Sequence, residues 1–285
     1  MVVNDKEKLV RILRQNGMSK SELARTLEVS YKTVYRWMKK NIQPHPAQSH
    51  AINTLFKEYV DLREFVIKLR ENLKNPIGIL NNEPSIREHF LLETVYNSNT
   101  IAGSRLTRKD TESAFKNEKV RGKELFEVLE AVNHKNALMY MLEEIKPDFK
   151  ITEDYILKLH SLIMYNFHDK HPGRYRNGVI NVTLKMKHFV AKVNSFGKDV
   201  IGKAANDHYE FKSIHPFYDG NSRVGRIILI TQLLSKEYPP AIIQSDDIYR
   251  YHMAMGKGDM GEFRDMIQII CNSIIEGYNL IKWEN

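Results

Sequence analysis

The stretch SIHPFYDGNSRVGRIILI, residues 213–230, places the strongest constraint on the fold. Pro216 disfavours helix at the residue before it, and the YDG that follows is typical of a turn. One helix therefore has to end at His215, and another has to begin just after Gly220. The second helix continues as IILITQLL, which is apolar on every side. A helix that is apolar all round is buried, so other elements have to cover it.

The chain has 285 residues, enough for one sizeable core and a smaller second domain. Its one cysteine, Cys271, excludes an internal disulfide. No stretch reaches the ~18–20 consecutive apolar residues of a membrane span. The first 15 residues carry charges where a signal peptide needs an apolar region. We therefore expect a cytoplasmic protein without a membrane partner.

Positive charge is concentrated near the N-terminus. Residues 1–75 contain 15 Lys and Arg against 8 Asp and Glu, whereas the remainder contains 28 against 27. The first quarter of the chain therefore carries almost the whole net charge of +8. A polyanionic partner is expected to bind there.

Three short helices are predicted at the start of the chain. Gly17 is suited to end the first helix, and Ser19 with Glu22 forms a capping-box pattern for the second. Ser30 is suited to cap a third helix, YKTVYRWMKK. A further helix is expected over HPAQSHAINTLFKEYV.

Small Ala24, followed by Val29 and Val34 at five-residue steps, matches the packing pattern of a helix-turn-helix. Residues 5–60 resemble the repressor-like helix-turn-helix domains, although Glu28 stands where that pattern usually has a glycine. The resemblance implies DNA binding, and the residues expected to contact DNA are Lys32, Thr33, Tyr35 and Arg36. A small three-helix domain with a solvated basic surface is the alternative.

The domain boundary is expected where breakers cluster. EYVDLREFVIKLRENL indicates a connecting helix, and KNPIGILNNEPS with its two prolines and one glycine indicates a linker. The predicted organisation is a helix-turn-helix domain over 1–60, a connecting helix and linker over 61–84, and a helical domain over 85–285.

One segment of the second domain departs from the helical pattern. In VINVTLKMKHFVAKV, residues 179–193, apolar side chains alternate with polar ones at Ile180, Val182, Leu184 and Met186, then at Phe189, Ala191 and Val193. This alternation predicts a short β-hairpin. A hairpin on a helical body buries little area, so its expected role is to cover or align something.

Four chemically active side chains lie around the start of the buried helix: His215, Asp219, Arg223 and Arg226. The N-terminal N–H groups and dipole of that helix form an anion site. The two guanidiniums suit phosphate oxygens, and several phosphates are needed to offset them. Asp219 is suited to Mg²⁺, and His215 can take a proton at neutral pH. These residues together predict group transfer from a nucleotide to a hydroxyl.

The same stretch resembles the signature of the Fic (Fido) family, His-x-Phe-x-Asp/Glu-Gly-Asn-Gly-Arg-x-x-Arg. The match is carried by His215, Phe217, Asp219, Gly220, Asn221, Arg223 and Arg226, and the resemblance extends over residues 85–275. It implies a mainly α fold with a short β-hairpin flap. It also implies transfer of AMP from ATP to a Ser, Thr or Tyr hydroxyl of a protein, including this chain itself, with release of pyrophosphate.

The resemblance assigns roles to residues of this chain. His215 would be the general base, and Asp219 would bind Mg²⁺. The nucleotide and its phosphates would be held by Gly220, Asn221, Ser222, Arg223, Arg226 and Tyr251. Ser222 departs from the family pattern, which has its second glycine there. If that position needs a positive φ, serine costs roughly 1 kcal/mol; if it does not, the hydroxyl adds a donor. We expect reduced transfer.

A second departure lies upstream, in TVYNSNTIAGSRLT. This segment resembles the family's inhibitory helix, Ser/Thr-x-x-x-Glu-Gly/Asn, expected here at about 88–103. Ser98 and Gly103 match, but Ala102 stands at the glutamate that pairs with the second motif arginine in the family. We therefore expect Arg226 to be free and the protein to be constitutively competent.

Two alternatives stay open. The chain is a DNA-binding regulator whose Fic domain binds nucleotide with little transfer, or the same site transfers another nucleotide or a phosphate. The sequence leaves the protein target, the nucleotide preference and the oligomeric state, including a dimer, undecided.

Overall fold

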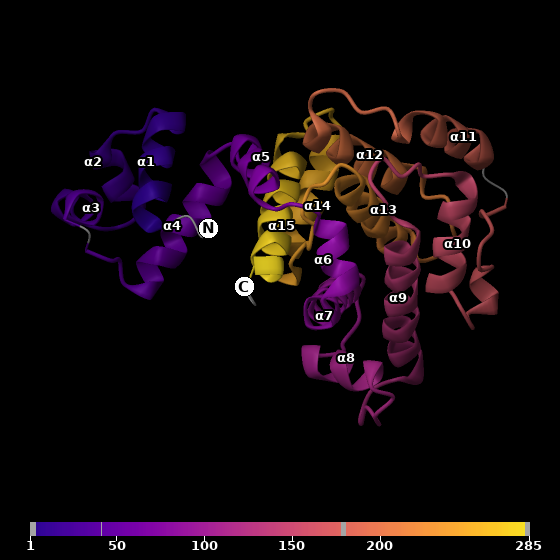
Figure 1. The fold of residues 1–285 in the computed structure, drawn as a ribbon. Coiled ribbons are helices and arrows are strands. Elements are labelled where there is room, and N and C mark those ends of the chain that lie inside the picture. Colours follow the sequence, from indigo (N-terminus) through magenta and orange to yellow (C-terminus); the bar gives the residue numbers. More distant parts are fainter. Residues whose placement is uncertain (1–3, 41, 178–180, 283–285) are drawn as a thin grey trace. The chain divides into compact units, whose positions relative to one another are not determined.

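The computed structural model describes residues 4–40, 42–177 and 181–282, which are mostly helical (Figure 1). The chain divides into two compact units, unit 1 (Met1–Phe65) and unit 2 (Val66–Asn285). Within the described ranges no helix is both long enough and apolar enough to cross a membrane.

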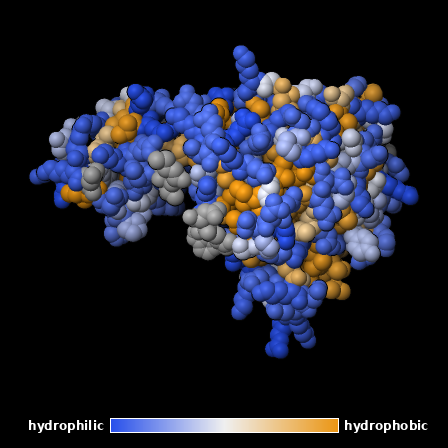
Figure 2. All heavy atoms as spheres, in the orientation of Figure 1, coloured by the Kyte–Doolittle hydropathy of each residue, from blue (hydrophilic) through white to orange (hydrophobic). Residues whose placement is uncertain are grey.

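Unit 1 is built from short helices that pack around one small core. They are α1 (Asp5–Asn16), α2 (Lys20–Thr26), α3 (Tyr31–Lys39) and α4 (Pro46–Tyr59). The core contains Leu9, Leu23, Val34 and Trp37, all of them buried. In the view of Figure 2 the surface of this unit is largely hydrophilic, while hydrophobic side chains emerge at several places over unit 2.

The caps predicted for these helices are confirmed. Gly17 ends α1 with a φ of 66°, and Ser19 and Glu22 form both halves of a capping box on α2. Ser30 caps α3 by accepting the N–H of Thr33. The turn between α2 and α3 contains Glu28 at a φ of 54°, a left-handed conformation that favours glycine.

The segment expected to be a connecting helix and linker contains two separate helices. α4 ends at Tyr59, and α5 (Arg63–Asn72) starts after a short break. α6 (Pro76–Asn82) occupies the stretch expected to be a linker, so that expectation is wrong. Pro76 is the first residue of α6, where its missing N–H costs nothing, and Asn75 caps the helix by accepting the N–H of Gly78.

Unit 2 surrounds one buried helix, as the sequence predicts. Its remaining helices are α7 (Pro84–Ile101), α8 (Arg108–Phe115), α9 (Leu125–Glu144), α10 (Glu153–Ile163), α11 (Val182–Val193), α12 (Val200–Ile214), α13 (Asn221–Ser235), α14 (Ile248–Gly258) and α15 (Arg264–Lys282), with 3₁₀ turns at His168–Lys170 and Ser245–Asp247. Of the residues in α13, only Ser222 is not fully buried. The helices α7, α9, α10 and α12 pack against it.

The predicted β-hairpin is wrong. Residues 182–193 form α11, and the described parts of the chain contain no strand. Val182, Met186, Phe189 and Val193 are spaced four, three and four residues apart, so they share one buried helical face. Leu184, which alternation would place inside, is 48 % exposed. Ile180 lies outside the described residues.

Candidate active site

The loop between α12 and α13 is fixed by Asn221. α12 ends at Ile214, and His215 follows in a left-handed conformation with a φ of 50°. The N–H of buried Phe217 donates to Oδ1 of Asn221 at 2.9 Å, and Nδ2 of Asn221 donates back to the carbonyl of Phe217 at 2.9 Å. This pair of hydrogen bonds closes the loop onto the first residue of α13.

Glycine is required at position 220. Gly220 precedes α13 with a φ of 74°, and a Cβ there would lie 2.8 Å from Cε of Met164 and 3.2 Å from Cγ2 of Ile163. Both the conformation and the contact with α10 therefore exclude a side chain. The N-terminal N–H groups of α13 can approach a ligand closely because of this glycine.

His160 of α10 packs against the loop between α12 and α13. Its ring stacks on Phe217 with centroids 3.7 Å apart, and its Nδ1 accepts the N–H of Gly173 at 3.0 Å. Nε2 therefore carries the proton and donates to the carbonyl of Asp219 at 3.3 Å. Burial lowers the pKa of His160 to about 4, so the ring is neutral at neutral pH.

Residues 176–177 also hold the loop between α12 and α13 through hydrogen bonds from the main chain. The N–H of Arg176 donates to the carbonyl of Pro216 at 2.9 Å, and the N–H of Asn177 donates to Oη of Tyr218 at 3.0 Å. The imidazole of His215 is exposed beside this segment. Partial burial and the charges of Arg176 and Lys212 lower the pKa of His215, against an opposing effect of Asp219. His215 is therefore an exposed neutral imidazole able to accept a proton.

Arg223 is buried but has carboxylate partners. It is 3 % exposed, its Nη1 lies 2.8 Å from Oε1 of Glu130 on α9, and its Nη2 lies 3.5 Å from Oδ1 of Asp219. Burial raises the pKa of Glu130. The side chain of Asp219 is 49 % exposed, so it is open to solvent at the mouth of the site.

Arg226 is buried and has neutral partners. It is 4 % exposed, its Nε donates to Oγ of Ser98 at 2.7 Å, and its Nη2 donates to the carbonyl of Ser98 at 2.6 Å. Its Nη1 makes no hydrogen bond to any described residue. One N–H direction of a buried cation is thus left for a ligand.

Ser222 lies in the first turn of α13 with ordinary helical backbone, since the positive-φ residues among those described do not include it. The strain considered for serine at this position is therefore absent. Its Oγ accepts a hydrogen bond from Nζ of Lys212, on the last turn of α12. The site thus contains a third cation that the motif does not include.

Comparisons with known proteins agree with this geometry. Residues 150–233 match the model of the Fic/DOC family. The chain is 28 % identical over 211 residues to the protein adenylyltransferase Fic of Nematostella vectensis, covering 68 % of this chain and 49 % of that protein. It is 25 % identical over 212 residues to the protein of the same name from Drosophila virilis, covering 69 % and 44 %. The chain thus spans about half the length of these curated relatives.

Solved structures show the same fold. Fic-1 from C. elegans superposes with a TM-score of 0.64 at 18 % identity, covering 100 % of this chain and 90 % of that one. A Fic domain containing signaling protein from Bacteroides thetaiotaomicron superposes with a TM-score of 0.66 at 21 % identity, covering 79 % and 98 %. The chain therefore contains a Fic domain, which the family model matches over residues 150–233. Its Fic domain is mainly α-helical, as the resemblance implies.

The segment that resembles the family's inhibitory helix lies in α7, which starts four residues earlier than the expected range. Ala102 lies at its exposed end, and Gly103 follows with a φ of 100°. The expectation that Arg226 is free is wrong, because Ser98 of the same helix occupies two of its nitrogens. Position 98 therefore holds the arginine although position 102 carries no carboxylate.

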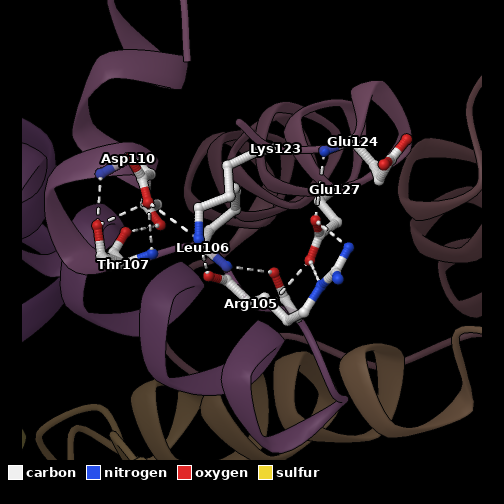
Figure 3. A network of polar contacts seen from close by, with 9 residues as sticks. Arg105, Leu106, Thr107, Asp110, Lys123, Glu124 and Glu127 are labelled. Atoms are coloured by element: carbon white, nitrogen blue, oxygen red, sulfur yellow. Dashed lines mark hydrogen bonds and ion pairs between the residues drawn. The ribbon is translucent and has the colours of Figure 1, made fainter. Parts of the chain in front are cut away.

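The loop after α7 is tied to the start of α9 (Figure 3). The N–H of Arg105 donates to Oε1 of Glu127 at 2.7 Å, and Nζ of Lys123 donates to the carbonyl of Arg105 at 2.6 Å. Glu127 is 1 % exposed, and the N–H of Arg105 lowers its pKa. These contacts fix the C-terminal end of α7, and with it Ser98, against the rest of the Fic domain.

Tyr251 lies in the interior of the Fic domain. It is 1 % exposed, and its hydroxyl lies 2.8 Å from Nε2 of His208, whose Nδ1 is 3.2 Å from the carbonyl of Gly225. Burial lowers the pKa of Arg226, and the interaction of this guanidinium with the Tyr251 hydroxyl opposes that shift. The structure therefore places Tyr251 behind Arg226 rather than on a surface open to a nucleotide base.

The predicted DNA contacts lie on α3 of unit 1. Lys32, Tyr35 and Arg36 are exposed on one side of the helix, whereas Val34 is buried on the other. Thr33 is half-buried, and its hydroxyl is hydrogen-bonded to Oγ of Ser30 at 2.8 Å. Three of the four side chains are thus available to a ligand.

Sequence reasoning missed several residues of the site. They are Glu130 of α9, His160 of α10, Arg176 of the segment before α11, Lys212 of α12, and Ser98 of α7 as the partner of Arg226. Of these residues, Lys212 was the easiest to predict, because it lies only three residues before His215 in the sequence.

Proposed function

We propose that the Fic domain transfers AMP from ATP to a Ser, Thr or Tyr hydroxyl of a protein, including this chain itself. The observation that carries the proposal is the arrangement around the start of α13. Two guanidiniums buried to 3 % and 4 % exposure lie within the first two turns of the buried helix α13, and the exposed, neutral imidazole of His215 precedes that helix. Adenylyltransferase is also the printed name of the relatives from Nematostella vectensis and Drosophila virilis.

In this mechanism a ring nitrogen of His215 takes the proton of the target hydroxyl. The hydroxyl oxygen forms a bond to the α-phosphorus of ATP, the bond from that phosphorus to the bridging oxygen breaks, and pyrophosphate leaves. The N–H groups of Gly220, Asn221 and Ser222 and the positive end of the α13 dipole stabilise the phosphate oxygens. Arg223 and Arg226 hold the β- and γ-phosphates.

The residues present fit a Mg²⁺ ion held by one protein carboxylate. The described residues contain no cluster of three or more potential ligands, and Asp219 presents a half-exposed carboxylate beside the phosphate site. Mg²⁺ is commonly bound by one or two carboxylates together with substrate phosphates. Asp219 would hold the ion, which would supply positive charge to the phosphate oxygens.

The test uses ATP labelled at the α-phosphate, Mg²⁺ and cell extract, with the wild type, His215→Ala and a γ-labelled control. We expect α-label on a protein band, a general-base loss of at least about 100-fold in His215→Ala, and no γ-label. Equal α- and γ-labelling would indicate transfer of a larger group, and γ-label alone would indicate phosphate transfer. No label in the wild type, with ATP binding retained, would favour the regulator that senses nucleotide.

We further propose that unit 1 binds DNA through the exposed face of α3. The support is the excess of basic residues over residues 1–75 and the exposure of Lys32, Tyr35 and Arg36. Fluorescence anisotropy with duplex DNA at several salt concentrations tests it: Arg36→Ala is expected to weaken binding and to lower the salt dependence by about one counterion. The cytoplasm is the expected compartment, since a chain with a single cysteine cannot form an internal disulfide.

A further inference from the structure

Lys212 and Ser222 form a contact that the Fic signature does not include. Lys212 lies on the last turn of α12, and its Nζ donates to Oγ of Ser222 in the first turn of α13. Ser222 is the residue that departs from the signature, which has glycine there. The departure therefore introduces a hydroxyl that accepts a hydrogen bond from a half-buried ammonium at the mouth of the anion site.

The cations of this region are unequally compensated. Arg223 lies within ion-pair distance of Glu130 and Asp219. Among the described residues, Arg226 donates to the hydroxyl and carbonyl of Ser98 and interacts with the hydroxyl of Tyr251, and Lys212 donates to the hydroxyl of Ser222. A buried charge is costly unless an opposite charge accompanies it. Two positive charges therefore face the site without a carboxylate of their own.

The same two cations affect each other. Burial and the charge of Arg226 lower the pKa of Lys212 to about 8. Together with burial and the charge of Arg176, the charge of Lys212 also lowers the pKa of His215, which directly follows the end of α12. Lys212 is thus electrostatically coupled to the exposed imidazole and to the buried guanidinium.

We propose that Lys212 and Ser222 are an additional phosphate-binding pair, which contacts the polyphosphate of a nucleoside triphosphate at the first turn of α13. The inference rests on the proposed nucleotide site. It adds that this site favours ligands with a charged polyphosphate over ligands without phosphate. The ammonium contributes a charge-assisted hydrogen bond to a phosphate oxygen, and the hydroxyl orients the ammonium when the site is empty and donates when it is filled. The serine that departs from the signature is in this way part of the site.

The test is a calorimetric titration of the full chain with ATP and, separately, with adenosine, which has no phosphate. The variants are Lys212→Met, which keeps an apolar stem without the charge, Lys212→Arg, and Ser222→Gly. Lys236→Met is the matched control: it removes one charge at the far end of α13, about 20 Å away, where Lys236 pairs with Asp148. Circular dichroism melts confirm that each variant is folded.

We expect Lys212→Met to weaken ATP binding at least about tenfold and to leave adenosine binding unchanged. Ser222→Gly should weaken ATP binding about threefold, and Lys212→Arg should retain most of it. Lys236→Met should bind both ligands as the wild type does. A loss of ATP and adenosine binding to the same extent would indicate a structural role for Lys212 and would overturn the proposal.

Wild-type ATP affinity in Lys212→Met would also overturn the proposal, while leaving the nucleotide site intact. A wild type that binds no ATP would overturn the nucleotide site and this pair together. If Lys212→Met does not fold, reductive methylation of the wild type followed by mass spectrometry gives the answer. ATP, but not adenosine, should protect Lys212 relative to Lys236, and equal labelling with and without ATP would contradict the pair.

Discussion

The basic residues of α3 in unit 1 and of α13 in unit 2 are placed in opposite ways. Lys32 and Arg36 of α3 are exposed, whereas Arg223 and Arg226 of α13 are 3 % and 4 % exposed. An exposed cation keeps its hydration and adds general attraction for polyanions, which salt screens. A buried cation keeps little hydration, so its partners are specific and few. This difference supports the proposed polyanion surface of unit 1 and the proposed selective anion site of unit 2.

The largest expected effect is the pH dependence of the stability of unit 2, which comes from the neutral histidines buried in its interior. Burial lowers the pKa of His160 to about 4 and that of His208 to about 3, compared with about 6.5 in an unfolded chain. The unfolded state therefore binds more protons below pH 6.5, and stability falls as the pH drops through that value. Unit 2 should lose about 2 kcal/mol for each histidine between pH 7.5 and pH 5.

Hydrogen exchange with mass spectrometry at the two pH values measures this loss for each unit. The matched variant is His208→Gln, which cannot titrate and should retain about two thirds of the pH-dependent loss, because burial also lowers the pKa of His160 and of His134. Unit 1 has His45 and His50 on its exposed surface and should lose less. An equal loss of stability in both units between the two pH values would contradict the assignment of the pH dependence to the buried histidines of unit 2.

The next largest effect is on ATP affinity. Arg226→Met removes the buried cation that lacks a carboxylate, and it should weaken ATP binding about 100-fold, or about 2.7 kcal/mol. Arg36→Met removes an exposed cation of unit 1 and should leave ATP binding unchanged. Isothermal titration calorimetry measures both. Equal losses would mean that net charge, and not the anion site at α13, determines nucleotide binding.

A smaller effect on stability is expected from the residues at the starts of α13 and α3, one of which is buried and the other exposed. Asn221→Ala should destabilise the Fic domain by about 2 kcal/mol, because the buried N–H and carbonyl of Phe217 each lose a partner. Ser30→Ala removes an exposed cap on α3 and should cost about 1 kcal/mol. Urea unfolding of each variant measures the difference. A larger loss for Ser30→Ala would show that Asn221 does not fix the loop.

The smallest effect tests the turn of unit 1. Glu28→Gly should stabilise that unit by about 0.5 kcal/mol, since a side chain in the left-handed region costs more than the extra freedom of glycine. Glu58→Gly, near the exposed end of α4, has the opposite sign and should cost up to about 1 kcal/mol. Thermal unfolding distinguishes them. A destabilised Glu28→Gly variant would show that Glu28 makes contacts that outweigh its conformation.

Local signals in the sequence predict much of this structure. The caps Ser19 and Ser30, the end of α12 before Pro216 and the burial of α13 all follow from neighbouring residues, whose effects act within one or two turns. The prediction of a β-hairpin failed because several of the apolar residues that alternate with polar ones over residues 179–193 also fit the spacing of a helical face. Met186 belongs to both patterns, and only packing against unit 2 selects the helical face.

The contacts within the site depend on tertiary structure. Ser98 and Arg226 are 128 residues apart, and no local pattern joins them. Because position 102 has no carboxylate, we expected Arg226 to be free. A serine hydroxyl and a main-chain carbonyl can also accept hydrogen bonds from a guanidinium, and Ser98 supplies both. The signature identifies Arg226, whereas its partner follows only from the packing of α7 on α13.

The most direct test of the account is a structure of the chain with a non-hydrolysable ATP analogue and Mg²⁺. The account predicts the triphosphate over the first turn of α13, with phosphate oxygens at hydrogen-bond distance from Arg226 and the Ser98 contacts to that guanidinium reduced or lost. A triphosphate bound elsewhere, with both Ser98 contacts intact at their present 2.7 Å and 2.6 Å, would contradict it.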